Sequence, residues 1–143
     1  MAATKQFILE KELSADSQLS SRKNPVLLLV EDDSQMRHIF LLLVKRLEAQ
    51  VMHAANAEEG LMMARDFTPV AIITDINLPG LNGLQFIECL KRNPITSRIS
   101  IVAWSSNSTY RQAALAAGAV DFIDKSDPGS HMLKCLQEIL GRN

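Results

Sequence analysis

Cysteine, net charge and long apolar runs are all scarce in this 143-residue chain. The two cysteines, Cys89 and Cys135, both lie in helical patterns, so we interpret them as reduced thiols and not as a disulfide or a metal site. The formal net charge of −1 gives no electrostatic basis for binding nucleic acid or a membrane. No apolar run approaches the roughly 20 residues of a membrane span, and residues 7–9 are too few for a signal-peptide core. We therefore expect a cytoplasmic chain.

The sequence also lacks a glycine-rich phosphate loop, which argues against nucleotide binding. Its three histidines, His38, His53 and His131, are scattered, and we interpret them as ordinary helix or surface residues. The length suits one domain, and a hydrophobic content of 47% is enough for a packed core.

Five apolar segments alternate with five amphipathic segments after residue 24. The expected strands cover residues 26–30, 50–55, 70–74, 99–104 and 120–123. The expected helices cover residues 35–49, 57–67, 83–92 and 109–117, and a last one with Asp127 as N-cap and Pro128 as its first residue. This alternation predicts an α/β fold, a parallel sheet with helices on both faces. Residues 1–24 are expected to form an N-terminal tail, in which residues 4–13 could make a short helix.

The stretch at residues 70–83, VAIITDINLPGLNG, places Asp75 at the end of an apolar run. A run of this kind is typical of a strand buried on both faces of a parallel sheet. In open α/β sheets, ligands bind at the carboxyl ends of the strands. We therefore interpret Asp75 as a carboxylate nucleophile.

The other predicted strand ends carry complementary groups. Glu31 and Asp32 follow the first strand, Ser105 ends the fourth and Lys125 follows the fifth. Three carboxylates brought together would repel one another, and Mg²⁺ is a cation that suits such oxygen ligands. Lys125 and the Ser105 hydroxyl could bind phosphate oxygens. The set predicts that Asp75 accepts a phosphoryl group with the help of Mg²⁺.

These motifs together resemble the receiver domain of two-component response regulators, such as the bacterial chemotaxis regulator. The resemblance covers about residues 25–142 and is carried by LLLVEDDSQMR (27–37), IITDINLPGLNGLQFI (72–87), IVAWSS (101–106) and AGAVDFIDK (117–125). It implies a flavodoxin-like, doubly wound sheet of five parallel strands in the order 2-1-3-4-5 with five helices. The expected receiver domain spans residues 25–143.

The resemblance also implies a metal site around the phosphoacceptor. Asp75 matches the phosphoacceptor aspartate, and Glu31 and Asp32 match the acidic pair that helps to hold Mg²⁺. Asn77 matches the position whose backbone carbonyl binds the metal.

Three further positions match the conformational switch of the family. Ser105, which we favour over Ser106, matches the switch hydroxyl, Phe122 the aromatic switch and Lys125 the lysine of the last strand. Two departures are visible: Ser126 stands where the family usually has proline, and the loop after the fourth strand is about two residues shorter than usual.

The function that we expect is transfer of a phosphoryl group to Asp75 from a sensor histidine kinase or a histidine phosphotransfer protein. The modification would then switch a surface that binds a downstream protein target. The chain would be a signalling phosphoacceptor and not an enzyme, apart from weak self-catalysed transfer and autodephosphorylation. We expect no output domain, because the sequence ends just past the last helix. We also expect no nucleic-acid or membrane partner, because the net charge is near zero and the sequence has no basic stripe and no long apolar run.

Two alternatives remain. A Mg²⁺-dependent aspartyl phosphohydrolase usually needs a second aspartate two residues after the nucleophile, where this chain has Asn77. A phosphorylation-independent adaptor is favoured slightly by Ser126 and disfavoured by the intact acidic residues and Lys125.

Overall fold

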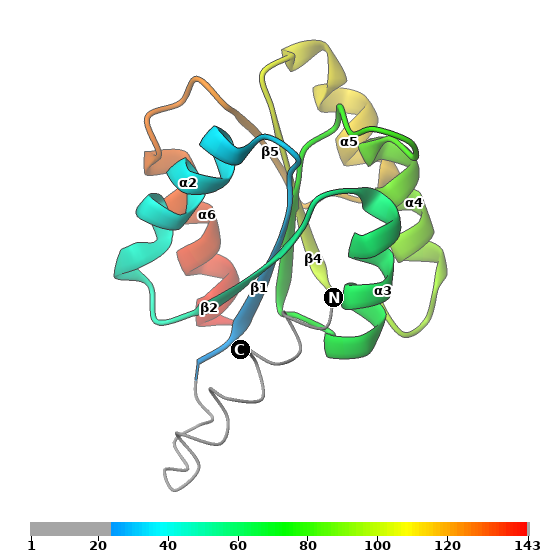
Figure 1. The fold of residues 1–143 in the computed structure, drawn as a ribbon, viewed down its shortest axis with the longest axis horizontal. Helices are drawn as coiled ribbons and strands as arrows, with labels where there is room; N and C mark the ends of the chain where they lie inside the picture. Colours follow the sequence, from blue (N-terminus) through cyan, green and yellow to red (C-terminus); the bar gives the residue numbers. More distant parts are fainter. Residues whose placement is uncertain (1–23, 143) are drawn as a thin grey trace, which may run out of the picture.

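The computed structural model describes residues 24–142 (Figure 1). One sheet of five parallel strands has the order β2-β1-β3-β4-β5. The strands are β1 (Val26–Val30), β2 (Gln50–Ala54), β3 (Ala71–Thr74), β4 (Ser100–Ser105) and β5 (Asp121–Asp124). The predicted flavodoxin-like fold and strand order are confirmed.

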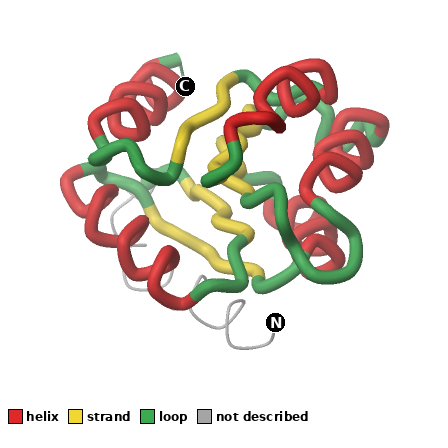
Figure 2. Tube along the Cα trace, turned by 90° about the horizontal axis from the view of Figure 1, so that it is seen from above, coloured by secondary structure: helices red, strands yellow, loops and turns green. Residues whose placement is uncertain are grey.

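The helices form two layers around this sheet. They are α2 (Ser34–Leu43), α3 (Ala57–Phe67), α4 (Gly83–Arg92), α5 (Arg111–Ala117) and α6 (Ser130–Gly141). α2 and α6 cover one face, and α3, α4 and α5 cover the other (Figures 1 and 2). Successive residues of β1 alternate between the two cores: Leu27 and Leu29 face the first pair of helices, and Leu28 faces the second layer. Because both faces are buried, solvent reaches the sheet mainly at its strand ends.

Short polar side chains fix where three of the helices begin. Asp33 accepts hydrogen bonds from the backbone N–H groups of the first turn of α2. At α3, the Asn56 side chain accepts a hydrogen bond from the Glu59 N–H. Asn82 and Gln85 form a reciprocal capping box at α4.

The first helix is shorter than the prediction of residues 35–49. It ends at Leu43, and a 3₁₀ turn over Val44–Arg46 follows. Leu47 is already extended, because the chain must turn back to begin β2, where the Gln50 N–H donates to the Pro25 carbonyl at 2.8 Å. The apolar spacing continued past the true end because the residues of the turn still face the core.

The start of the last helix also differs from the prediction. Its N-cap is Gly129, with φ of 112°, so Asp127 and Pro128 lie before the helix. A Cβ atom at Gly129 would overlap the side chain of Leu43, which explains why glycine occupies this cap. Asp127 still stabilises the helix start, because its Oδ1 accepts hydrogen bonds from the N–H groups of Gly129 (2.9 Å) and His131 (3.3 Å).

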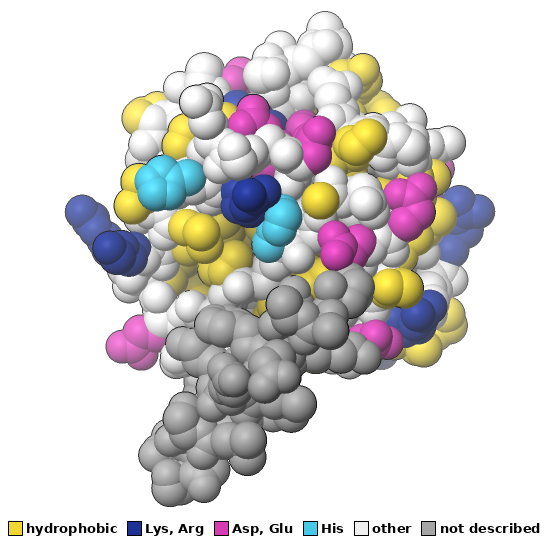
Figure 3. Space-filling model, in the orientation of Figure 1, with side chains coloured by type: hydrophobic (Ala, Val, Ile, Leu, Met, Phe, Trp, Pro, Cys, Tyr) yellow, Lys and Arg dark blue, Asp and Glu magenta, His cyan; other side chains and the backbone are white. Residues whose placement is uncertain are grey.

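β1, α3 and α4 begin and end as predicted, and the remaining boundaries shift by one or two residues. β4 and β5 lie one residue later than predicted, and a 3₁₀ turn over Ser108–Tyr110 precedes α5. The predicted tail helix at residues 4–13 lies outside the described residues. Within residues 24–142 there is no helix with the length and apolar character needed to cross a bilayer. Acidic and basic side chains are interspersed over the described part of the face in Figure 3.

Candidate functional site

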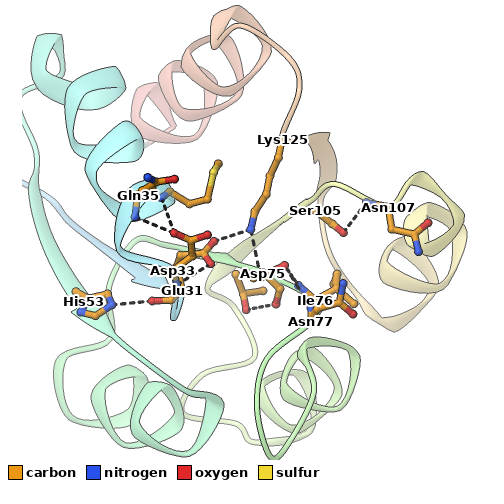
Figure 4. A network of polar contacts seen from close by, with 12 residues as sticks. Glu31, Asp33, Gln35, His53, Asp75, Ile76, Asn77, Ser105, Asn107 and Lys125 are labelled. Carbon is orange, nitrogen blue, oxygen red and sulfur yellow. Dashed lines mark hydrogen bonds and ion pairs between the residues drawn. The ribbon is translucent and has the colours of Figure 1, made fainter.

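The carboxyl edge of the sheet brings three carboxylates and one ammonium group together. Figure 4 shows Glu31, Asp75 and Lys125 of this group. Carboxylate oxygens of Glu31, Asp32 and Asp75 all lie within 4.8 Å of one another. Lys125 Nζ is 2.8 Å from Glu31 Oε1 and 3.2 Å from Asp75 Oδ2. The polar strand ends that the sequence singled out therefore meet, as the parallel sheet requires.

Asp75 is held by its own loop. It follows the last residue of β3 and is 7% exposed. Its Oδ1 accepts hydrogen bonds from the N–H groups of Ile76 (2.7 Å) and Asn77 (3.2 Å). The loop closes tightly, because Gly83 N donates to the Ile76 carbonyl at 2.8 Å and a Cβ atom at Gly83 would overlap the Asp75 carbonyl. One oxygen of Asp75 is thus fixed by backbone amides, while the other faces Lys125.

Glu31 is fully buried at the end of β1. Its Oε2 accepts a hydrogen bond from the Asp33 N–H at 3.2 Å. Burial raises the pKa of the Glu31 carboxyl above its usual 4.5, Lys125 acts in the opposite direction, and the charge of Asp75 raises it further. The ionised form of Glu31 therefore benefits from any additional cation at this edge.

The donor set fits a divalent metal ion. Asp32 is exposed beside the two buried carboxylates, so the site is open on one side. One ammonium group cannot neutralise three carboxylates, and carboxylate oxygens are the ligands that Mg²⁺ prefers. The backbone N–H of Asn77 points to Asp75, and its side chain is exposed.

An open cleft lies beside the acidic cluster. Asp32, Asn77 and Pro79 line it together with Leu84 and Tyr110. Tyr110 comes from the 3₁₀ turn before α5, and no pattern in the sequence indicates that it lies at this cleft. The cleft therefore opens beside Asp32, the exposed member of the acidic cluster.

His53 on β2 contacts the acidic strand end, which the sequence did not predict. Its Nε2 lies 2.8 Å from the carbonyl oxygen of Glu31. Because a carbonyl only accepts hydrogen bonds, Nε2 is the donor. Arg37 Nη1 lies 3.3 Å from the same nitrogen and cannot also donate to it. The edge strand is thus tied directly to the backbone of the acidic site.

The candidate switch residues lie on β4 and β5. Ser105 is fully buried and its Oγ accepts a hydrogen bond from the Asn107 N–H at 3.1 Å, whereas Ser106 is exposed. Phe122 is only 2% exposed. The Arg111 guanidinium lies 5.8 Å from the centre of its ring and donates to its carbonyl at 3.3 Å. The aromatic ring is therefore already buried in this structure.

Ser126, the departure from the family pattern, takes part in a hydrogen-bonded turn. Its N–H and Oγ donate to Asp124 Oδ1 at 2.8 and 2.7 Å. These hydrogen bonds hold the pKa of Asp124 below its usual 3.8. All peptide bonds of residues 24–142 are trans, and Lys125 reaches the site from this turn.

Known protein families, sequences and structures that are similar to this chain agree with this fold. The response regulator receiver domain model matches residues 27–137. The nitrate/nitrite response regulator protein NarL of Escherichia coli K12 is 27% identical over 122 residues, covering 84% of this chain and 56% of that protein. Protein PilH of Pseudomonas aeruginosa is 28% identical over 116 residues, 80% of this chain and 96% of PilH. A response-regulator structure from Chloroflexus aurantiacus has a TM-score of 0.78 at 26% identity, covering 83% of this chain and 99% of that one.

The chain therefore belongs to the response regulator receiver domain family of two-component systems. Receiver domains are signalling phosphoacceptors that bind Mg²⁺ at an acidic site, and the acidic cluster of this chain is compatible with that metal. The chain spans about half the length of NarL, so the activity and partners of NarL as a whole do not transfer to it.

Proposed function

We propose that Asp75 accepts a phosphoryl group from a phosphohistidine of a sensor histidine kinase or a histidine phosphotransfer protein. The observation that carries this proposal is the pairing of a nearly buried aspartate with Lys125 at 3.2 Å. In the reaction, an Asp75 carboxylate oxygen attacks phosphorus, and a P–O bond forms as the P–N bond breaks. The imidazole leaves with the electron pair of that bond and takes up a proton from water.

The acidic cluster supplies the metal ligands for this proposal. Asp32, Asp75 and the backbone carbonyl of Asn77 would hold Mg²⁺, and Glu31 would act mainly through water. When bound, Mg²⁺ screens the carboxylates from the incoming phosphate and neutralises charge during the transfer. Lys125 then pairs with one phosphoryl oxygen.

The output that we propose is a change of the surface formed by α5, β5 and α6. The Ser105 hydroxyl donates a hydrogen bond to the phosphoryl group and moves inward. Phe122 is already buried, so the signal would pass through its packing against Arg111 and not through a large swing of the ring. A downstream protein then binds the altered surface.

The same site supports a signalling role over a catalytic one. Asn77 cannot supply the second carboxylate of an aspartyl phosphohydrolase, so we expect only slow loss of the phosphoryl group. We propose that the receiver domain begins at Pro25, close to the start of the family match at residue 27. The cytoplasmic location remains a prediction from the sequence.

The test is intact-mass measurement after incubation with Mg²⁺ and acetyl phosphate. Wild type is expected to gain one phosphoryl group and Asp75→Asn none. Asp66→Asn, an exposed aspartate on α3, serves as the matched control and should be labelled like wild type. Labelling of Asp75→Asn would show that the acceptor is another residue.

A wild-type protein that is folded by circular dichroism but takes no label would need one more measurement. If phosphorylated histidine kinases or phosphotransfer proteins also fail to label it, the adaptor alternative replaces this proposal. Labelling by the protein donor alone would keep Asp75 as the acceptor and exclude small-molecule donors.

A further inference from the structure

Lys125 must cross a neighbouring strand to reach the acidic cluster. It follows β5, whereas Asp75 follows β3, and β4 lies between these two strands. The Lys125 N–H donates to the Ser105 carbonyl at 3.0 Å, so its backbone is fixed beside the end of β4. Its side chain then extends over β4 towards Asp75 and Glu31 (Figure 4).

Trp104 occupies β4 under this path. It pairs with Ile123 in the parallel register, and both side chains belong to the core under α2 and α6. Lys125 follows Ile123 by two residues and so leaves β5 towards the same face. Lys125 Nζ lies 5.4 Å from the centre of the Trp104 ring, which is itself 2% exposed.

We propose that Trp104 is a positioning residue that holds the Lys125 ammonium over its ring and between Glu31 and Asp75. The negative face of an aromatic ring attracts a cation within about 6 Å, and tryptophan attracts it most strongly. The Lys125 side chain is only 13% exposed, which strengthens the attraction because little water competes. The ring of Phe40 on α2 packs against the indole, with the two ring centroids 5.9 Å apart and the ring planes inclined by 57°.

The role of the ring follows from the two unequal ion pairs. Lysine has a flexible four-carbon stem, and its nearer carboxylate is Glu31, at 2.8 Å against 3.2 Å for Asp75. Without a surface beneath it, the ammonium group would be free to move towards the nearer carboxylate, Glu31. Trp104 therefore keeps Lys125 within reach of Asp75 and of a phosphoryl group on it. This inference rests on the proposed function only for its effect on labelling.

The first experiment compares Trp104→Leu and Trp104→Phe in labelling by acetyl phosphate. Removing the ring face should slow the initial rate about tenfold, and phenylalanine should restore most of it. In a Lys125→Met background, Trp104→Leu should cause no further loss, because the two side chains act as one unit. Equal losses in both backgrounds would reduce Trp104 to a packing residue and overturn the proposal.

The second experiment needs no phosphorylation. The chain contains one tryptophan, so its fluorescence reports on Trp104 alone. Lys125→Met should change the emission intensity and shift its maximum, whereas Lys134→Met, on an exposed part of α6, should change neither. An emission spectrum unchanged by Lys125→Met would overturn the placement of the ammonium over the ring.

The two experiments also separate this inference from the proposed function. A wild-type protein that takes no label but responds to Lys125→Met by fluorescence keeps the cation over the ring and loses the phosphoacceptor role. A wild type that is labelled, with Trp104→Leu labelled at the same rate, keeps the phosphoacceptor and loses the positioning role. If Trp104→Leu does not fold, the phenylalanine variant and the fluorescence of Lys125→Met test the positioning role of Trp104 instead.

Discussion

The loops after β3 and β5 deliver the two opposite charges of the site, and they fix them in different ways. Asp75 is held by the next two backbone N–H groups of its own loop. Lys125 is held by residues far away in the sequence: Glu31, Asp75 and the ring of Trp104. The anion is positioned locally, and the cation by the assembled sheet.

The two loops therefore depend on different interactions for their geometry. The geometry around Asp75 depends on a tight turn that Gly83 closes. The position of Lys125 depends on the order of the strands and on the charges of two other loops. Substitutions in the loop after β3 should therefore affect mainly the folding of the chain. Substitutions in the loop after β5 should affect mainly the electrostatics of the site.

The largest effect is expected from Gly83→Ala. The added Cβ would overlap the Asp75 carbonyl and lie 2.6 Å from Ile76 Cα, so the loop must move. Urea unfolding should show a loss of about 3 kcal/mol in the free energy of unfolding. Gly141→Ala is the control, because its Cβ would meet no atom within 4 Å, and it should be neutral or stabilising by up to about 1 kcal/mol. Equal stability of the two variants would mean that the loop can accommodate a Cβ atom at position 83 without strain.

A smaller effect is expected from Lys125→Met. Removing the ammonium leaves Glu31 buried beside Asp75, and the free energy of unfolding at pH 7 should fall by about 2 kcal/mol. The pKa of Glu31 is already raised, and loss of Lys125 raises it further. A carboxyl with a raised folded-state pKa contributes stability at low pH that is lost as pH rises from its unfolded value of 4.5 through its folded value. The deficit of the variant should therefore shrink as the pH is lowered from 7 towards 5.

Urea unfolding at several pH values measures this, with Lys134→Met as the control for loss of an exposed charge. Mg²⁺ should recover part of the stability, because it replaces the missing positive charge. A deficit that does not depend on pH would assign the loss to packing of the lysine stem instead.

The smallest effect is expected from Ser126→Ala. This change removes the Oγ–H donor to Asp124 and keeps the N–H donor. Asp124 has a lowered pKa, so its stabilising contribution is present above 3.8 and is lost as pH falls through the folded value. Ser126→Ala should flatten the acid side of the stability profile and change little at pH 7. Ser130→Ala, also exposed, should leave the profile unchanged, and a large loss at pH 7 in Ser126→Ala would contradict a purely local turn.

The sequence was sufficient for the parts of the site that depend on strand ends. Asp75 and Lys125 could be placed because parallel strands bring their carboxyl ends to one edge. The interaction of Trp104 with Lys125 could not, because it depends on the register of β4 with β5, which the strand order does not give. Roles assigned by resemblance, such as that of Ser105, stay predictions.

The ends of two helices could not be predicted for the same reason, because they depend on contacts with distant residues. Helix spacing located the five α-helices within residues 24–142, but the end of α2 depends on the turn into the edge strand. The N-cap of α6 depends on Leu43, which lies about ninety residues away in the sequence. A local pattern carries no information about such contacts.

The hydrogen bond between His53 and the Glu31 carbonyl has a consequence for the edge strand β2. An edge strand has only one neighbour, and a slip by one residue would turn every side chain to the opposite face. The 2.8 Å contact of His53 Nε2 exists in one register only, with His53 opposite Leu29. The hydrogen bond to Glu31 therefore favours the native register of β2. In any other register the carbonyl oxygen of Glu31 would lose its hydrogen bond from His53.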